Sequence, residues 1–270
     1  VTFAAADVQA KTQGLFPAPR AILCAAVEGM QVDIDTADRI EARYLAHVAT
    51  SQVAKNMISY FFQMNRLRSG ESRPTGFEKS SVSRLGILGA GMMGSGIAFM
   101  AAQAGIDVFL KDLDIATAEK GKSYSDVVAS KLVASGKMSE AQKVALLSRI
   151  QATGQASDLA GCDLVIEAVF EDRALKRKVT EEIDAVLADD AIFASNTSTL
   201  PITGLAQAFS RPTDFIGLHF FSPVDRMKLV EIICGKQTSD ATLARAYDFV
   251  RQLGMVPIVV NDSRDFYTSR

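Results

Sequence analysis

Three glycines between an apolar run and an alanine-rich stretch constrain the fold of this sequence more than any other feature. Gly89, Gly91 and Gly94 have the spacing Gly-x-Gly-x-x-Gly and follow residues 85–88, a run short and apolar enough for a buried parallel strand. The alanine-rich stretch behind them stops at Gly105, as a helix does. Strand, glycine turn and helix in this order predict a unit of a dinucleotide-binding fold.

Each glycine has its own physical role in such a unit. Gly89 allows the tight turn, Gly91 lets the backbone approach a pyrophosphate, and Gly94 lets the helix lie close to the strand. The free N–H groups and the partial positive charge at the helix N-terminus favour phosphate binding. The alternative is a glycine-rich loop that serves only tight packing.

A second apolar run, residues 108–110, ends close to Asp112, about 20 residues after the glycine turn. A carboxylate at this distance can accept hydrogen bonds from the adenine ribose, and it would repel a 2′-phosphate. Asp112 therefore favours NAD over NADP, although the neighbouring Lys111 weakens that preference slightly.

The 270-residue chain has a net charge of −2 and three cysteines, Cys24, Cys162 and Cys234. This charge implies no general attraction to nucleic acid or to an anionic membrane, and no apolar run is long enough to span a membrane. An odd number of widely spaced cysteines argues for a reducing compartment and against both a disulfide framework and a zinc site. The sequence starts without Met and ends without a terminating signal, so we expect a piece of a longer protein.

Residues 1–82 lack the alternation of strands and helices that follows them. We expect helices over 21–28, after a cap at Asp35, and after a cap at Ser51. The last of these carries an apolar stripe at helical spacing, interpreted as core, which consists of Val53, Met57, Phe61 and Met64. Residues 71–83 are polar, with one proline and one glycine, a composition typical of a linker.

From Asp112 onward, predicted helices and strands alternate. The expected helices are 116–134, 139–148, 173–187 and 240–253. The expected strands are 164–166, 191–194, 215–220, 229–233 and 256–260. This alternation predicts an α/β protein with a Rossmann-like, doubly wound and mostly parallel sheet.

The sequence contains two histidines in different settings. His47 lies in a predicted helix among alanines, where a structural or surface role is the simpler interpretation. His219 lies where a predicted strand leaves the sheet, and ligands of open α/β sheets bind beyond the carboxyl ends of strands. Position alone leaves a catalytic role and a hydrogen-bonded core histidine equally open.

Glu231 interrupts the otherwise apolar strand 229–233. If it is buried there, its carboxylate needs a partner; the alternative is a partly exposed edge position. Paired with His219, it would fix the ring tautomer and favour the protonated imidazole. Oxidation of an alcohol requires such a base, because the hydroxyl proton leaves while a hydride goes to a nicotinamide.

Two further polar groups follow predicted strands. Residues 195–198, Ser-Asn-Thr-Ser, either line the same edge of the sheet or form a polar turn that caps the next helix. Glu171 and Lys176 flank the start of the helix predicted at 173–187. From the residues alone, both are interpreted as surface charges.

The motifs at 89–94, 165–171, 194–198, 217–221 and 228–231 together resemble those of the L-3-hydroxyacyl-CoA dehydrogenase family. The resemblance runs from residue 84 to residue 270. Residues 1–66 resemble the tail of an enoyl-CoA hydratase, or crotonase-like, domain. This order is similar to that of the alpha subunit of the multifunctional fatty-acid oxidation complex and of a related peroxisomal enzyme.

The resemblance implies a division of the chain into four segments. These are the helical tail of the hydratase domain (1–50), a connecting helix and linker (51–82), the NAD-binding domain (83–264) and the start of a C-terminal helical domain (265–270). In this family the C-terminal domain closes over the acyl group and mediates dimerisation. The hydratase's catalytic glutamates would lie before residue 1. We therefore expect the chain to bind NAD, to hydrate no enoyl-CoA and to turn over a hydroxyacyl-CoA poorly.

The resemblance also assigns roles to single residues. His219 would be the catalytic base, Glu231 its orienting partner, and Ser198 a hydrogen-bond donor to the substrate oxygen. Ser269 and Asn65 would join Ser198 at the substrate. The NAD site would consist of Gly89, Gly91, Met93, Gly94, Asp112, Val169, Phe170, Glu171, Lys176, Ser198 and Ser222.

Three positions depart from the family's pattern. Ser222 and Ser269 stand where Asn is usual, and serine is a shorter donor. Asp265 replaces a Gly that normally precedes Phe266. If that Gly has a positive φ, Asp is strained there, although Asp tolerates the left-handed conformation better than most residues.

Residues and resemblance together predict NAD-dependent oxidation of (S)-3-hydroxyacyl-CoA to 3-oxoacyl-CoA in fatty-acid β-oxidation. The parent protein would also be an enoyl-CoA hydratase and would work with a thiolase beta subunit. It would lie in the cytoplasm of a bacterium, or in a peroxisome or mitochondrion of a eukaryote. One alternative is a β-hydroxyacid dehydrogenase of a small free acid, although those enzymes usually rely on a lysine base. Another is an NAD-binding module without chemistry.

Overall fold

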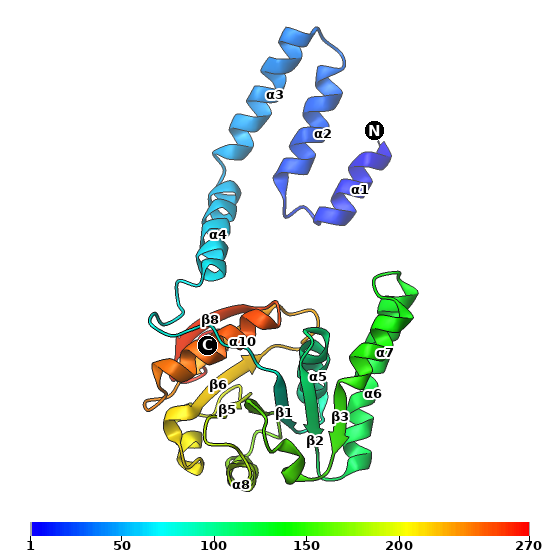
Figure 1. Cartoon of the computed structure of the whole chain (residues 1–270). Helices are drawn as coiled ribbons and strands as arrows, with labels where there is room; N and C mark the ends of the chain where they lie inside the picture. Colours follow the sequence, from blue (N-terminus) through cyan, green and yellow to red (C-terminus); the bar gives the residue numbers. More distant parts are fainter. Residues whose placement is uncertain (1, 270) are drawn as a thin grey trace. The chain divides into compact units, whose positions relative to one another are not determined.

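The structure, a computed structural model, describes residues 2–269 and divides into two compact units, Val1–Ser69 and Gly70–Arg270 (Figure 1). Within the described residues, every helix is too short or too polar to cross a membrane. The first unit is helical, and the second contains the sheet.

The helices of the first unit are α1 (Thr2–Thr12), α2 (Pro17–Gly29), α3 (Ile34–Ala49) and α4 (Gln52–Ser69). Helix α3 begins one residue before the expected cap. Asp33 is the N-cap, because its carboxylate accepts a hydrogen bond from the Thr36 N–H at 3.0 Å, and Asp35 lies in the first turn. Ser51 caps α4 as expected, since its hydroxyl accepts from the Ala54 N–H at 3.2 Å.

Within its own unit the apolar stripe of α4 is not core, so that prediction is wrong there. Val53, Met57 and Phe61 are 37%, 50% and 59% exposed. Helical spacing shows only which face would be buried, and burial requires another element to cover that face. Helix α4 extends past the other helices of its own unit (Figure 1), and none of its residues is buried.

Among the described residues, eight strands form one sheet in the order β3-β2-β1-β4-β5-β6-β7-β8. Every neighbouring pair is parallel except β6 and β7, which confirms the predicted mostly parallel sheet. The strands are β1 (Arg84–Leu88), β2 (Asp107–Lys111), β3 (Ile150–Thr153), β4 (Leu164–Glu167), β5 (Ile192–Ser195), β6 (Phe215–Phe220), β7 (Leu229–Cys234) and β8 (Val256–Asn261). Strand β3 was not expected, because four residues including a glutamine carry too little of a strand pattern.

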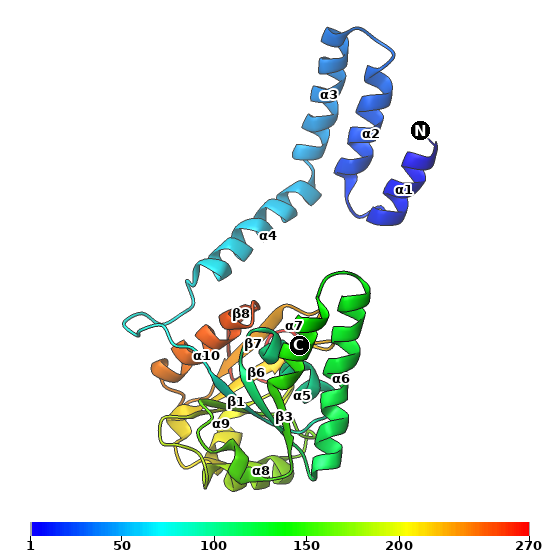
Figure 2. The ribbon, with the colours of Figure 1, turned by 45° about the vertical axis from the view of Figure 1, so that its right-hand side comes forward.

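Helices cover both faces of this sheet (Figure 2). They are α5 (Met92–Gln103), α6 (Ile115–Ala134), α7 (Glu140–Ser148), α8 (Arg173–Asp184), α9 (Ile202–Leu205) and α10 (Asp240–Gln252), with 3-10 turns at 156–159, 206–208 and 212–214. Successive residues of β4 serve different faces. Leu164 and Ile166 pack in the cluster that contains Phe99 of α5, whereas Val165 packs in the cluster that contains Ile183 of α8. The sheet is therefore doubly wound, as expected.

The polar segment before β1 is not a free linker. The Arg73 guanidinium donates two hydrogen bonds, of 2.7 and 2.8 Å, to the Asp248 carboxylate on α10, and the Ser80 N–H donates to the same group at 2.9 Å. Farther along, the Gln252 side chain pairs with both the N–H and the C=O of Val82 at 2.9 Å. Residues 70–83 thus belong with the second unit, which starts at Gly70.

Candidate active site

The glycine turn lies at the carboxyl end of β1 and has the geometry that its spacing predicts. Gly89 has a φ of +95°, and a Cβ there would lie 2.8 Å from the Ala168 carbonyl oxygen. A Cβ at Gly94 would lie 1.8 Å from the Gly89 carbonyl oxygen. A Cβ at Gly91, the N-cap of α5, would meet no atom within 4 Å. Two glycines thus permit the close packing, and the third leaves open space at a helix N-terminus, which fits a pyrophosphate.

Asp112, at the end of β2, is tied to this turn. Its carboxylate accepts hydrogen bonds from the Ala90 N–H at 2.6 Å and from the Leu113 N–H at 2.7 Å. Each oxygen keeps a second lone pair for a ribose hydroxyl. The Lys111 ammonium pairs with Glu182 at 3.1 Å. The positive charge of Lys111 is therefore balanced by Glu182. Lys111 was expected to weaken the preference for NAD over NADP, and this pairing removes that objection.

His219 and Glu231 lie directly opposite each other on the antiparallel strands β6 and β7. Their side chains meet, with 2.7 Å between the ring Nδ1 and the carboxylate Oε2. Glu231 is fully buried, so the alternative of an exposed edge position is wrong. Because a carboxylate only accepts hydrogen bonds, the neutral ring carries its proton on Nδ1. The lone pair is then on Nε2, the atom that can act as a base.

The second oxygen of Glu231 is held by main chain that sequence reasoning did not implicate. Oε1 accepts hydrogen bonds from the Tyr267 N–H at 3.2 Å and the Thr268 N–H at 2.9 Å. The chain reaches this position through two consecutive left-handed residues, Asp265 (φ +59°) and Phe266 (φ +51°). Asp265 thus has the positive φ at which an Asp in place of the family's Gly was expected to be strained.

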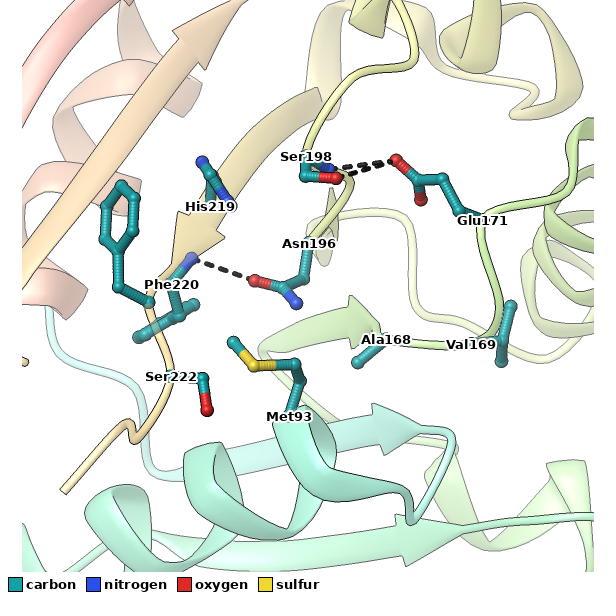
Figure 3. A pocket seen from close by; sticks show the side chains of 10 residues that line it. Met93, Ala168, Val169, Glu171, Asn196, Ser198, His219, Phe220 and Ser222 are labelled. Atoms are coloured by element: carbon teal, nitrogen blue, oxygen red, sulfur yellow. Dashed lines mark hydrogen bonds between the residues drawn. The ribbon is translucent and has the colours of Figure 1, made fainter. Parts of the chain in front are cut away.

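A cavity of about 320 Å³ lies at the carboxyl edge of the parallel strands (Figure 3). It is lined by Met93, Ala168, Val169, Glu171, Asn196, Ser198, His219, Phe220, Phe221 and Ser222. These residues come from the N-terminal turn of α5 and from the segments at the carboxyl ends of β4, β5 and β6, the edge where open α/β sheets bind ligands. Segments more than 100 residues apart in sequence are therefore brought to one cavity.

Glu171 holds the turn that carries Ser198. Its Oε1 accepts hydrogen bonds from the Thr197 hydroxyl, from the Ser198 N–H at 3.0 Å and from the Thr199 N–H at 3.2 Å. Burial raises the pKa of Glu171. The Thr197 hydrogen bond and the Lys176 charge lower it by more than burial raises it, so the pKa lies below its ordinary value. Glu171 is consequently ionised at neutral pH, the state that binds these donors best.

Lys176 is buried, so its interpretation as a surface charge is wrong. Its ammonium lies 2.7 Å from Glu167 Oε1, 3.2 Å from Glu171 Oε2 and 3.4 Å from the Val169 carbonyl oxygen. Three acceptors match the three N–H donors of a lysine. Glu167, which also accepts from the Ser195 hydroxyl at 2.8 Å, was missed. A carboxylate in an otherwise apolar strand was the available signal, as at Glu231.

Comparison with known proteins identifies the family. Residues 84–263 match the family described as 3-hydroxyacyl-CoA dehydrogenase, NAD binding domain. The chain belongs to the 3-hydroxyacyl-CoA dehydrogenase family. The glycine turn and the Asp112 carboxylate described above lie in its NAD-binding domain.

Curated relatives cover nearly the whole chain. The fatty acid oxidation complex subunit alpha of Psychrobacter arcticus is 36% identical over 94% of this chain, and that of Shewanella sp. strain MR-4 is 37% identical over 99%. The alignments cover 35% and 38% of those proteins. The chain thus spans about a third of the length of the curated relatives it matches.

Solved structures of 3-hydroxybutyryl-CoA dehydrogenases resemble about two thirds of the chain. (S)-3-hydroxybutyryl-CoA dehydrogenase from Ralstonia eutropha is 42% identical, with a TM-score of 0.68 over 70% of this chain and 66% of that one. 3-Hydroxybutyryl-CoA dehydrogenase from Escherichia coli K12 is 28% identical, with a TM-score of 0.66 over 68% of this chain and 39% of that one.

Other residues that the resemblance to 3-hydroxyacyl-CoA dehydrogenases singled out lie in varied settings. Ser222 lines the cavity, where its hydroxyl donates to the Met92 sulfur at 3.6 Å. Phe170 is 87% exposed beside the cavity wall, and Ser269 is exposed near the end of the chain. Asn65 is exposed on α4, in the first unit. The roles proposed for these residues stay predictions. His47 is exposed on α3, in keeping with a surface role.

Proposed function

We propose that this chain provides the dehydrogenase site of a protein that oxidises (S)-3-hydroxyacyl-CoA to 3-oxoacyl-CoA with NAD. One observation carries the proposal: the imidazole of His219, held at Nδ1 by a fully buried carboxylate, lines the cavity beside the glycine turn. A base with that geometry is what the removal of a hydroxyl proton requires. The family membership supports the cofactor and the class of substrate.

The side chains would divide the reaction as follows. His219 Nε2 takes the hydroxyl proton, and the imidazolium that forms is stabilised by Glu231 through the Nδ1–H. The Ser198 hydroxyl, presented by the turn that Glu171 holds, donates to the substrate oxygen. When bound, NAD supplies the hydride acceptor. Strand β6 thus places the base, and the turn after β5 places the donor, at the wall of one cavity.

The wider context of the parent protein is part of the same proposal. The curated relatives are alpha subunits of the fatty acid oxidation complex. We propose that the parent likewise works in fatty-acid β-oxidation, hydrates enoyl-CoA with a domain that ends in residues 1–50, and pairs with a thiolase beta subunit. Its location would be the cytoplasm of a bacterium, or a peroxisome or mitochondrion in a eukaryote.

The test is His219→Gln in the full-length parent. Loss of the base should lower kcat for (S)-3-hydroxybutyryl-CoA by about 10²- to 10⁴-fold, measured as NADH formation, with little change in NADH affinity. His47→Gln makes the same change at an exposed position and should leave kcat unaltered.

The alternatives give different results in the same assays. A dehydrogenase of small free acids would oxidise 3-hydroxybutyrate faster than its CoA ester. A binding module without chemistry would bind NADH and show no turnover in the unmodified parent. A kcat unchanged by His219→Gln would remove His219 as the base.

A further inference from the structure

The sheet order shows which end of a bound dinucleotide would reach the cavity. Strand β1, with the glycine turn, lies between β2 and β4. Asp112, the ribose acceptor, is at the end of β2, and the pyrophosphate position at Gly91 follows β1. The other half of the dinucleotide therefore extends toward the segments after β4, β5 and β6, where the cavity lies. This end carries the nicotinamide, whose carboxamide is an uncharged hydrogen-bonding group.

Most polar side chains of the cavity wall already have partners within the protein. The Ser222 hydroxyl donates to the Met92 sulfur, and the Ser198 hydroxyl donates to Glu171 Oε1 in a long contact of 3.4 Å. His219 uses Nδ1 for Glu231, which leaves an acceptor at Nε2. The Asn196 side chain is different, because within the described part of the chain only its amide oxygen Oδ1 has a partner, and the amide nitrogen Nδ2 has none.

The geometry of Asn196 fixes which end of its amide faces the cavity. Its Oδ1 accepts a hydrogen bond from the Phe220 N–H at 2.9 Å, and that backbone group can only donate. The nitrogen is therefore the other end, and Figure 3 shows it on the side of Met93 and Ala168. The main-chain N–H of Asn196 donates to the Glu167 carbonyl oxygen at 2.8 Å. Backbone and side chain are both anchored, so the two amide donors are held in place before any ligand binds.

We infer that Asn196 binds the nicotinamide end of the cofactor by donating a hydrogen bond from Nδ2 to the carboxamide oxygen. The inference rests on the proposed function. Through Oδ1 the same side chain holds the main chain at Phe220, the residue after the base His219. One amide thus couples the orientation of the nicotinamide ring to the position of the base.

The test compares two ligands on the same chain. ADP-ribose has the adenosine, pyrophosphate and ribose of the cofactor but no nicotinamide. Asn196→Asp keeps an acceptor for the Phe220 N–H and removes the donor. It should weaken NADH binding about 3- to 10-fold, the effect of one hydrogen bond, and change ADP-ribose affinity less than about 2-fold. Both dissociation constants can be measured by calorimetric titration.

Two further variants separate the donor from other effects. Asn196→Ala removes the donor without adding charge and should show the same selective loss of NADH affinity. Asn261→Asp makes the matched change at the end of β8, which pairs with Cys234 and so lies at the edge of the sheet opposite the cavity. It should alter neither affinity.

The results that overturn the inference are distinct. Equal weakening of NADH and ADP-ribose in Asn196→Asp would mean that the residue only shapes the protein, and unchanged NADH affinity would mean that it makes no contact. An unmodified chain that binds neither ligand would overturn the dinucleotide site, and the proposed function with it.

Discussion

At the scale of single residues, the site depends on a buried charge whose partners come from two other parts of the chain. Glu231 binds the ring of His219 through one oxygen and two backbone N–H groups, at Tyr267 and Thr268, through the other. A buried carboxylate is stable only when it is satisfied in this way. The turn that supplies the backbone donors includes Asp265, whose φ of +59° is unfavourable for a residue with a side chain.

Asp265→Gly should therefore stabilise the chain. Glycine adopts positive φ without strain, although it gains entropy in the unfolded state, so we expect an increase of up to about 1 kcal/mol in the free energy of unfolding. Urea denaturation measures it. Gly254→Asp is the matched reverse change, since Gly254 has a φ of +71° and open space around its Cβ position, and it should destabilise. A lower stability for Asp265→Gly would contradict the strain argument.

At the scale of elements, ion pairs and charged hydrogen bonds fix segments that lack regular structure. The turn 197–199 is fixed by Glu171, which is itself paired with Lys176 of α8. The segment 70–83 is fixed to α10 by Asp248 and Gln252. In both cases a side chain satisfies main-chain donors that no strand or helix satisfies.

The Glu171 contacts should make one part of the stability depend on pH. The pKa of Glu171 is lowered from 4.5 in the folded chain, so its ionised form stabilises the fold above that value. This contribution is lost as the pH falls through the lowered pKa. We expect Glu171→Gln to reduce the melting temperature at pH 7, and this reduction should shrink as the pH falls below 4.5. A melting-temperature difference that persists at low pH would show that charge is not the cause.

Asp248→Asn should loosen the segment that precedes β1. The Arg73 and Asp248 side chains are only 15% and 10% exposed, so the loss of a charged partner should cost about 1–3 kcal/mol of unfolding free energy. Limited proteolysis should then cut within residues 74–80. Lys11→Ala breaks a pair whose side chains are 73% and 59% exposed and should change stability by less than about 0.5 kcal/mol. An equal loss of unfolding free energy in the two variants would refute the argument that burial makes the Arg73–Asp248 pair the stronger one.

At the scale of the whole molecule, the two units differ in how they are stabilised. The second unit has an apolar cluster on each face of its sheet. Within residues 3–69 no residue is buried, so the first unit has little hydrophobic stabilisation of its own. The unit that contains the candidate site therefore carries its own core.

A fragment of residues 70–270 should fold and bind NADH within about twofold of the affinity of the whole chain, because the glycine turn, Asp112 and the cavity lie in this unit. A fragment of residues 84–270 lacks Arg73 and Ser80, and it should unfold at lower urea concentration. Fluorescence titration and urea denaturation check the two statements. A 70–270 fragment that does not bind NADH would show that the first unit contributes to the site.

Much of the second unit could be predicted from local sequence. The glycine spacing and the apolar runs determined a turn, a helix and most strands, because each depends on residues close together in the chain. The rule that ligands bind at the carboxyl ends of strands then led to His219, and the apolar setting of Glu231 led to its partner.

Only the tertiary structure decided which polar and apolar residues are covered. Three of the four stripe residues on α4 are exposed within their unit, and Lys176 is buried between two carboxylates. The Asn196 amide is oriented by a hydrogen bond to a residue 24 positions away. The backbone donors to Glu231 at Tyr267 and Thr268 are 36 and 37 positions away from it. Sequence periodicity predicts which face of its own helix or strand a side chain occupies. Burial and hydrogen bonding depend on what lies opposite, and residues distant in the sequence provide that.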